Sequence, residues 1–398
     1  MRFPVDEQAV VEFTRDLVRI RSVHEPQHGR GEAEVAALVA DRMRSFGWSP
    51  EVIEVAPGRP NVVAVVEGGG GEGPTLAFEG HTDVVTEGDA ADWTVDPYGG
   101  EIRDGRLYGR GSADMKSGVA AMIYAVRALE QTGPFPGRVT LCVLADEEGL
   151  MLGAKHFAAS PAAAAVDAAI IGEPEEGEIC IAAKGAIRLQ IELTGAMAHG
   201  AMPQHGRNPV ASTGTLLGAL AAYQRQLQSE LGSHDHLGPP YVTPTVIHAG
   251  SVDQINVIPA RATVCVDIRT VPDLDHETVV AVVTKLAEAS ATEDRVTAEV
   301  TVVDDRPAVE IDVGHPVVVA LAAAHEAVTG EPARYGGVPG ATDGTILTRD
   351  AGIPTAVYGP GGKWIAHQAD EYVEVADIVR CAHVYAEAAD RYLRGGAR

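Results

Sequence analysis

The 398-residue sequence is poor in cysteine and in aromatic side chains, and it has no long hydrophobic run. Its four cysteines are Cys142, Cys180, Cys265 and Cys381, and no two of them form a Cys-x-x-Cys pair. Scattered cysteines of this kind are typical of reduced, mostly buried thiols, so we expect a cytoplasmic protein. Residues 1–10 lack a basic segment followed by an apolar core, which argues against a secretory signal. No apolar run is long enough to span a membrane.

Positive charge is also scarce. Lysine and arginine number 31 against 56 acidic residues, which gives a formal net charge of -25 at pH 7. This deficit argues against nucleic-acid and anionic-membrane partners, because both reward clusters of Lys and Arg. We interpret the excess of carboxylates mainly as a source of solubility, with some of them available as ligands for a cation. A small-molecule substrate is therefore expected.

The length and the order of segments predict two domains. In residues 1–183 and 305–398, short apolar runs alternate with helical stretches, which is typical of an α/β layer with a mostly parallel sheet flanked by helices. Residues 184–304 follow a β-α-β-β-α-β order, which is that of a ferredoxin-like α+β unit. We therefore predict an α/β domain with a ferredoxin-like domain inserted in it. The glycine run 68–73 lies between two strand-like runs and precedes no helix, so we predict a hairpin turn there and not a phosphate loop.

Histidine and acidic residues gather after predicted strands and at sharp turns, where ligands bind in open α/β sheets. Alone, each is a weak signal, because a lone histidine is usually a surface or core residue and an aspartate before a helix is usually an N-cap. Together they predict a metal site. The segments are Gly80–Asp83 with His81, Gly109–Gly118 with Asp114, Ala145–Gly149 with Glu147 and Glu148, Gly172–Pro174 with Glu173, and Trp364–Glu371 with His367.

The pattern also suggests chemical roles. His81 and Asp83 point the same way in an extended segment, so Asp83 can accept the spare ring N–H of a metal-bound His81. Asp114 has two oxygens and could bridge two ions. Glu147 and Glu148 face different directions, so one can bind metal while its neighbour acts as a base. Oxygen and nitrogen ligands without thiolate suit zinc, cobalt or manganese, and two such ions can activate a water and polarise a carbonyl.

These residues, in this order, resemble the metallopeptidase family of acetylornithine deacetylase, succinyl-diaminopimelate desuccinylase, aminoacylase and glutamate carboxypeptidase, over essentially the whole chain. Gly80–Asp83 and Ser112–Lys116 carry the most specific part of the resemblance. It implies a cis peptide bond after Asp114, a general base at Glu147, and Asp83 as the partner of His81. It also implies two metal ions that share Asp114, one held by His81, Asp114 and Glu173, the other by Asp114, Glu148 and His367.

By the same resemblance, the inserted domain is a lid and a homodimer surface. His199 would stabilise the oxyanion of the tetrahedral intermediate, and in dimeric relatives this histidine reaches the partner's site. Arg269 would grip a substrate carboxylate with its planar fork. Asn256, Gly361 and Asp343, the last in a family-like loop, complete the candidate substrate-binding residues. Simpler interpretations stay open for His199, which could be an ordinary loop residue, and for Arg269, which could be a salt-bridge partner on a sheet.

We expect hydrolysis of an amide bond next to a free carboxylate by a metal-activated water, with an N-acyl amino acid as the favoured substrate. Closure of the lid would bring His199 and Arg269 to that substrate. A dipeptidase or carboxypeptidase of the same mechanism is the alternative, because its substrates also present an amide beside a carboxylate. A non-catalytic metal-binding relative is an alternative of another class, against which the presence of Glu147 argues. A nucleotide-dependent enzyme is disfavoured, because no Walker or Gly-x-Gly-x-x-Gly motif is present.

Overall fold

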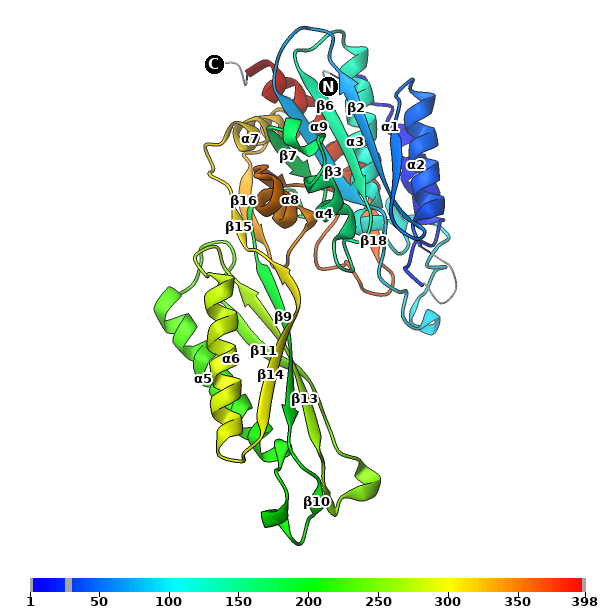
Figure 1. The fold of residues 1–398 in the computed structure, drawn as a ribbon. Coiled ribbons are helices and arrows are strands. Elements are labelled where there is room, and N and C mark those ends of the chain that lie inside the picture. The colour runs from blue at the N-terminus through cyan, green and yellow to red at the C-terminus, as the bar shows by residue number, and fades with distance from the viewer. Residues whose placement is uncertain (1–2, 26–30, 396–398) are drawn as a thin grey trace. The chain divides into compact units, whose positions relative to one another are not determined.

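The computed structural model of the protein describes residues 3–25 and 31–395. The chain divides into two compact units (Figure 1). The first unit comprises Met1–Ile181, Ile311–Val338 and Thr342–Arg398, and the second comprises Ala182–Glu310 and Pro339–Ala341. The second unit extends past the predicted boundary at residue 304, because the short strand β15 (Val309–Glu310) pairs antiparallel with residues 182 and 183.

The first unit is built on a large mixed sheet with the strand order β1-β2-β6-β3-β7-β17-β8. The neighbours β6, β3, β7 and β17 run parallel at its centre, and the outer pairs are antiparallel. The inner strands are almost wholly buried, as expected for a parallel sheet covered on both faces. These strands are β1 (Glu51–Ala56), β2 (Arg59–Glu67), β3 (Thr75–His81), β6 (Arg138–Leu144), β7 (Ala168–Ile171), β8 (Glu178–Ala183) and β17 (Thr355–Val357).

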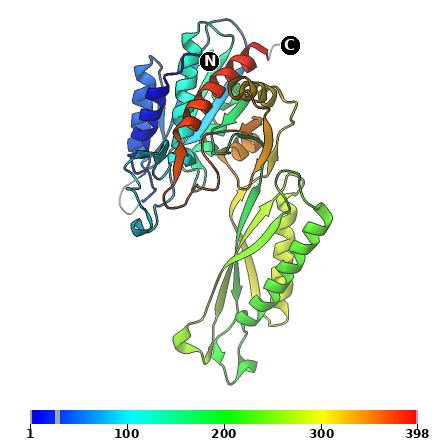
Figure 2. The same cartoon turned by 180° about the vertical axis from the view of Figure 1, so that it is seen from behind.

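Helices cover both faces of this sheet (Figures 1 and 2). The helices α1, α2, α3, α7 and α9 pack into one continuous hydrophobic core, and α4 and α8 pack together on the opposite face. Asp6 caps α1 by accepting the backbone N–H of Ala9 at 3.0 Å. The helices are α1 (Glu7–Val18), α2 (Ala33–Ser45), α3 (Ser117–Gln131), α4 (Leu152–Ala158), α7 (Pro316–Thr329), α8 (Asp343–Ala351) and α9 (Val375–Gly395).

Smaller elements complete the first unit. The strand β16 pairs with β8, and β18, β5 and β4 form a separate three-stranded sheet. No helix within residues 3–25 and 31–395 is long and apolar enough to cross a lipid bilayer. The short strands are β4 (Ile102–Arg103), β5 (Arg106–Tyr108), β16 (Arg334–Val338) and β18 (Tyr372–Glu374).

The second unit has a four-stranded antiparallel sheet in the order β11-β13-β9-β14, with two helices packed on one face. Along the chain, β9, β11, β13 and β14 are the first, second, third and fourth strands of a β-α-β-β-α-β unit. Their order across the sheet is therefore second, third, first, fourth, which confirms the predicted ferredoxin-like topology. A two-stranded ribbon of β10 and β12 lies beyond one end of the sheet (Figure 1). The elements are β9 (Gly185–Thr194), β10 (Ala198–His199), α5 (Pro209–Leu231), β11 (Tyr241–Ala249), β12 (Val257–Ile258), β13 (Arg261–Thr270), α6 (His276–Thr292) and β14 (Thr297–Arg306).

The hairpin predicted at glycines 68–73 is wrong. The strands β2 and β3 on either side of this run are not neighbours, because β6 lies between them in the sheet. The run instead packs along the turn before β6, where the N–H of Gly68 donates to Gly137 O at 3.0 Å and that of Gly70 to Phe135 O at 2.9 Å. A Cβ atom on Gly68 would lie 2.0 Å from Phe135 O, so this close approach requires glycine.

Candidate active site

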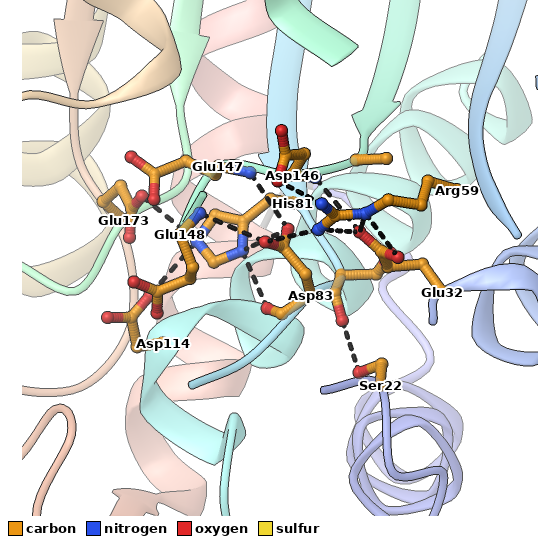
Figure 3. A network of polar contacts seen from close by, with 12 residues as sticks. Ser22, Glu32, Arg59, His81, Asp83, Asp114, Asp146, Glu147, Glu148 and Glu173 are labelled. Carbon is orange, nitrogen blue, oxygen red and sulfur yellow. Dashed lines mark hydrogen bonds and ion pairs between the residues drawn. The ribbon is translucent and has the colours of Figure 1, made fainter. Parts of the chain in front are cut away.

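The side chains singled out in the first unit converge at one edge of its sheet. His81 is the last residue of β3, Glu147 and Glu148 follow the end of β6, and Glu173 follows the end of β7. Because β6, β3 and β7 are parallel neighbours, their carboxyl ends meet at the same edge. Figure 3 shows the three glutamates gathered around His81.

Asp114 lies between two histidine–carboxylate groups. His81 Nε2 is 3.2 Å from Asp114 Oδ1 and 3.4 Å from Glu173 Oε1. On the other side, His367 Nε2 is 3.2 Å from Asp114 Oδ2 and 2.8 Å from Glu148 Oε1. In each group the ligand atoms lie within 4.8 Å of one another. Each oxygen of Asp114 thus serves a different group, which is the arrangement that a bridging carboxylate requires.

The residues of this cluster fit a pair of divalent cations. His81 Nε2 and Asp114 Oδ1 are buried and make no hydrogen bond with any described residue. Burial and the nearby negative charge of Asp114 raise the pKa of Glu173 to about 8, and the same two causes raise the pKa of Glu148. Crowded, buried carboxylates of this kind are stabilised by positive charge between them. The nitrogen and oxygen donors without a thiolate suit zinc, cobalt or manganese.

The histidines and carboxylates of the cluster shift one another's pKa. Hydrogen bonds to Asp114 and Glu148 raise the pKa of His367 to about 10. Burial alone would lower the pKa of His81, but the carboxylates of Glu173 and Asp114 outweigh burial and raise this pKa well above its usual value. Burial alone would raise the pKa of Asp114, but the two histidines beside its carboxylate lower it. A metal must therefore displace protons from the histidines when it binds.

Asp83 contacts His81 differently from what the sequence predicts. The closest acceptor to His81 Nδ1 is the backbone carbonyl of Asp83, at 3.0 Å, whereas its carboxylate Oδ1 is 3.5 Å away. The carboxylate is turned toward the backbone N–H groups of Glu147 and Glu148, which donate to it at 3.2 and 3.1 Å. One residue thereby fixes both the ring of His81 and the turn after β6.

Glu147 is buried beside the two groups, 7% exposed. Burial raises the pKa of its carboxyl group well above the usual value; His81 opposes this shift, and Glu173 and Glu148 add to it. A raised pKa means that the carboxyl group holds a proton more readily, which suits a group that accepts and returns a proton. The peptide bond between Asp114 and Met115 is cis, as the family resemblance implies.

Sequence reasoning assigned no role to Glu371 and Arg110, although both lie in segments that it singled out. The buried carboxylate of Glu371 accepts the backbone N–H groups of Ala113 and Asp114 at 3.0 and 3.1 Å. Arg110 donates to Glu371 at 2.6 Å and to the backbone carbonyl of His367 at 3.3 Å. This pair therefore joins the segment of the bridging aspartate to that of the second histidine.

Two further residues differ from expectation. Asp343 is the first residue of α8 and not part of a loop, because the segment after it packs as a helix on β7 and β17. Its buried carboxyl group lies close enough to Glu79 on β3 to raise the pKa of Glu79, to which burial contributes most. Glu79 was missed, although a glutamate inside an apolar strand, two residues before His81, is a usable signal.

The remaining candidates lie partly in the first unit and partly in the second. Gly361 in the first unit has φ +89°, and a Cβ there would lie 3.1 Å from the Cβ of Ala113. In the second unit, His199 pairs with residue 257 between β10 and β12, and the N–H of Gly200 donates to Asn256 O at 2.7 Å. Arg269 is held by Asp267 in two hydrogen bonds of 2.6 and 3.3 Å, so it has the salt-bridge partner considered from the sequence.

The α/β fold and the paired ligand groups are those of a metal-dependent hydrolase. Residues 77–391 match peptidase family M20/M25/M40, and the chain belongs to this family. It is 33% identical to the succinyl-diaminopimelate desuccinylase of Rhodospirillum centenum over 97% of each chain.

Solved structures share the fold at low sequence identity. An M20 family metallo-carboxypeptidase from Sulfolobus solfataricus aligns with a TM-score of 0.80 at 18% identity, covering 97% of this chain and 99% of that one. A dinuclear metal-binding M20 peptidase from Bacillus subtilis aligns with a TM-score of 0.74 at 18% identity, covering 97% of this chain and 98% of that one.

Proposed function

We propose that the protein is a two-metal deacylase that hydrolyses the amide bond of an N-acyl amino acid, of the acetylornithine deacetylase or succinyl-diaminopimelate desuccinylase type. The observation that carries this proposal is Asp114 placed between two histidine–carboxylate groups with the buried Glu147 beside them. The full-length similarity to a desuccinylase supports the choice of an acyl amino acid as substrate.

The geometry of the cluster supports the following proposed roles. His81, Asp114 and Glu173 would hold one ion, and Asp114, Glu148 and His367 the other. Zinc is the proposed metal, with cobalt or manganese as substitutes that accept the same ligands. Two bound ions supply a water of lowered pKa and Lewis-acid polarisation of the substrate carbonyl.

Glu147 would act as the proton carrier. Its burial raises the pKa of its carboxyl group, which favours its taking a proton from the attacking water and returning it to the leaving amine. Asp83 holds the backbone of Glu147 and orients His81 at the same time. We propose that Asp343 and Gly361 border the substrate in the first unit.

We propose that the protein is a homodimer, and the spacing of two candidate residues in the second unit supports this proposal. Arg269 pairs with residue 186 and Arg261 with Thr194, so Arg269 lies at one end of β9, and the ribbon that carries His199 lies beyond the other (Figure 1). Eight residues of strand span about 26 Å at roughly 3.3 Å per residue, too far for both side chains to contact one small substrate. Closure of the lid in one subunit would therefore bring only one of the two side chains to a given substrate. Within a dimer, Arg269 and Asn256 would be substrate contacts contributed by different subunits, and His199 would act on the partner's site.

We also propose that the protein works in the cytoplasm. Its four cysteines are all free, three of them buried and Cys265 partly buried. Unpaired thiols are typical of proteins in a reducing compartment.

The test is hydrolysis of N-succinyl, N-acetyl and dipeptide substrates by metal-stripped protein, with zinc, cobalt or manganese restored. We expect the restored metal to restore cleavage of an N-acyl amino acid by the wild type. Glu147→Gln should lose this cleavage, although the variant and the wild type should each bind two ions. The matched control is Glu130→Gln, an exchange outside the cluster. Preferred cleavage of dipeptides would replace the deacylase by a peptidase of the same mechanism. Two bound ions with no hydrolysis of any substrate would refute the proposed function.

A further inference from the structure

A single buried arginine joins three carboxylates behind the candidate metal ligands (Figure 3). Arg59 is 5% exposed. Its Nη2 lies 2.7 Å from Glu32 Oε1 and 3.6 Å from Asp83 Oδ2, and its Nη1 contacts Asp146 Oδ1. The side chains of the three acids are at most 2% exposed. Buried charges persist in proteins when they are paired, so this guanidinium is the counter-charge that the three acids share.

The four residues come from segments that are far apart in the chain. Glu32 precedes α2, Arg59 begins β2, Asp83 follows β3 and Asp146 follows β6. Glu32 stands at the N-cap position of α2 but its side chain makes no capping bond there. Its Oε1 instead accepts the backbone N–H of Asp146 at 3.1 Å, in addition to Arg59. Its carboxylate is therefore committed to the turn after β6 and not to its own helix.

The network reaches the candidate catalytic residues through two of its acids. Asp83 accepts the backbone N–H groups of Glu147 and Glu148. Asp146, with φ +71°, accepts those of Leu150 and Leu152 at 3.1 and 3.3 Å. Both ends of the turn that carries Glu147 and Glu148 are thus held by carboxylates that contact Arg59.

We propose that Arg59, anchored by Glu32, is a positioning residue that fixes this turn and so sets where Glu147 and Glu148 stand relative to His81. Arginine suits the task because its planar fork presents several donors in fixed directions to several acceptors. A lysine would keep the positive charge, yet its single ammonium group cannot meet three carboxylates in the same geometry. The assignment of Glu147 as base and Glu148 as ligand rests on the proposed function, whereas the contacts of Arg59 do not.

Arg59→Lys is the primary test, and Arg42→Lys is its control. Arg42 is a partly buried arginine on α2 that stacks on Phe13 and contacts Tyr124, remote from the network. Folding is checked by circular dichroism, and Co²⁺ binding is measured by chelator competition and by the visible absorption spectrum. Substitution of groups that support metal ligands typically weakens metal affinity or activity about 10- to 100-fold. For Arg59→Lys we expect Co²⁺ affinity to fall about 10- to 100-fold and the Co²⁺ spectrum to change. For Arg42→Lys we expect neither change.

In substrate turnover, we expect Arg59→Lys with Co²⁺ restored to lose kcat while KM stays near the wild-type value, because the network touches the turn and not the substrate. If Arg59→Lys does not fold, Glu32→Gln takes its place in the same measurements, since it removes the anchor and leaves the arginine. A folded variant with unchanged Co²⁺ affinity, spectrum and kcat would show that the network serves stability only. If the wild type binds Co²⁺ but hydrolyses nothing, the proposed function fails, and the affinity and spectrum still decide the role of Arg59.

Discussion

At the residue scale, the candidate metal ligands and the residues that support them differ in how easily a sequence reveals them. His81, Asp114 and Glu173 each lie at the end of a strand, just after one or in a glycine-rich turn, and the edge of a parallel sheet brings such positions together. Arg59 and Glu371 carry no such signal, because each pairs with residues more than 20 positions away. Long-range ion pairs of this kind follow from the tertiary fold and cannot be inferred from local pattern.

The support that Glu371 gives to Asp114 can be tested directly. In Glu371→Gln the two backbone N–H groups lose a charged acceptor and Arg110 loses its buried counter-ion. We expect metal affinity to fall about 10- to 100-fold, measured by chelator competition. Glu374→Gln, which removes an exposed partner of Arg106, is the control and should bind metal like the wild type. Equal affinities for the two variants would contradict the role.

Metal binding should depend on pH in a defined direction. The pKa of His367 is raised to about 10 and that of Glu173 to about 8 in the metal-free protein, so both groups carry protons at pH 7. Binding of Zn²⁺ must release these protons, and affinity therefore rises with pH and levels off above about pH 10. Calorimetric titration at pH 7 in buffers of different ionisation enthalpy counts the protons released. An affinity that is flat between pH 6 and pH 8 would contradict the pKa directions.

At the scale of elements, the order of strands and helices was predictable and the pairing of one strand was not. The alternation of apolar runs indicated β2, β3, β6 and β7, and the β-α-β-β-α-β order indicated the second unit. The error at glycines 68–73 arose because β6, contributed by Arg138–Leu144, inserts between two strands that are consecutive in the chain. Local pattern identifies a strand but does not specify its neighbour.

The glycine run offers a test at this scale. Gly68→Ala places a methyl group against the backbone of Phe135, which cannot move as a flexible side chain does. We expect the free energy of unfolding of the first unit, measured by urea denaturation, to fall by about 1–3 kcal/mol. Gly218→Ala in α5 meets nothing within 4 Å and should instead stabilise the second unit by about 0.5–1 kcal/mol. A neutral Gly68→Ala would mean that the close packing does not hold.

At the scale of the whole molecule, the placement of His199 and Arg269 toward opposite ends of the sheet in the second unit predicts that each active site needs residues from two subunits. His199→Ala and Arg269→Ala should each abolish most activity. Mixed after unfolding and refolding, they should regain about a quarter of the wild-type activity, because half of the dimers are mixed and each of these has one complete site. Activity is assayed before and after mixing, with the subunit composition checked by native mass spectrometry. If mixed dimers form but activity does not recover, both side chains act in the active site of the same subunit.

Metal should stabilise the two units unequally. All the residues of both ligand groups belong to the first unit. A ligand that binds only the folded state stabilises it by mass action, by roughly 2.7 kcal/mol at a concentration 100 times the Kd. Hydrogen exchange with and without Zn²⁺ should therefore show increased protection in β3, β6 and β7 and little change in β9 and β13. An equal increase in protection from exchange in both units would indicate that the ions bind elsewhere.

The way the chain divides also sets the order in which its parts are completed during synthesis. Nearly all of the second unit is one continuous stretch, Ala182–Glu310, so it can fold as soon as it leaves the ribosome. The first unit is completed later, because α9, which packs against α3, and the candidate ligand His367 are synthesised after the second unit. During that interval β3, β6 and β7 stand on the nascent chain without the helix that covers them. Exposed apolar strands make such an intermediate prone to aggregation in a way that the completed fold is not.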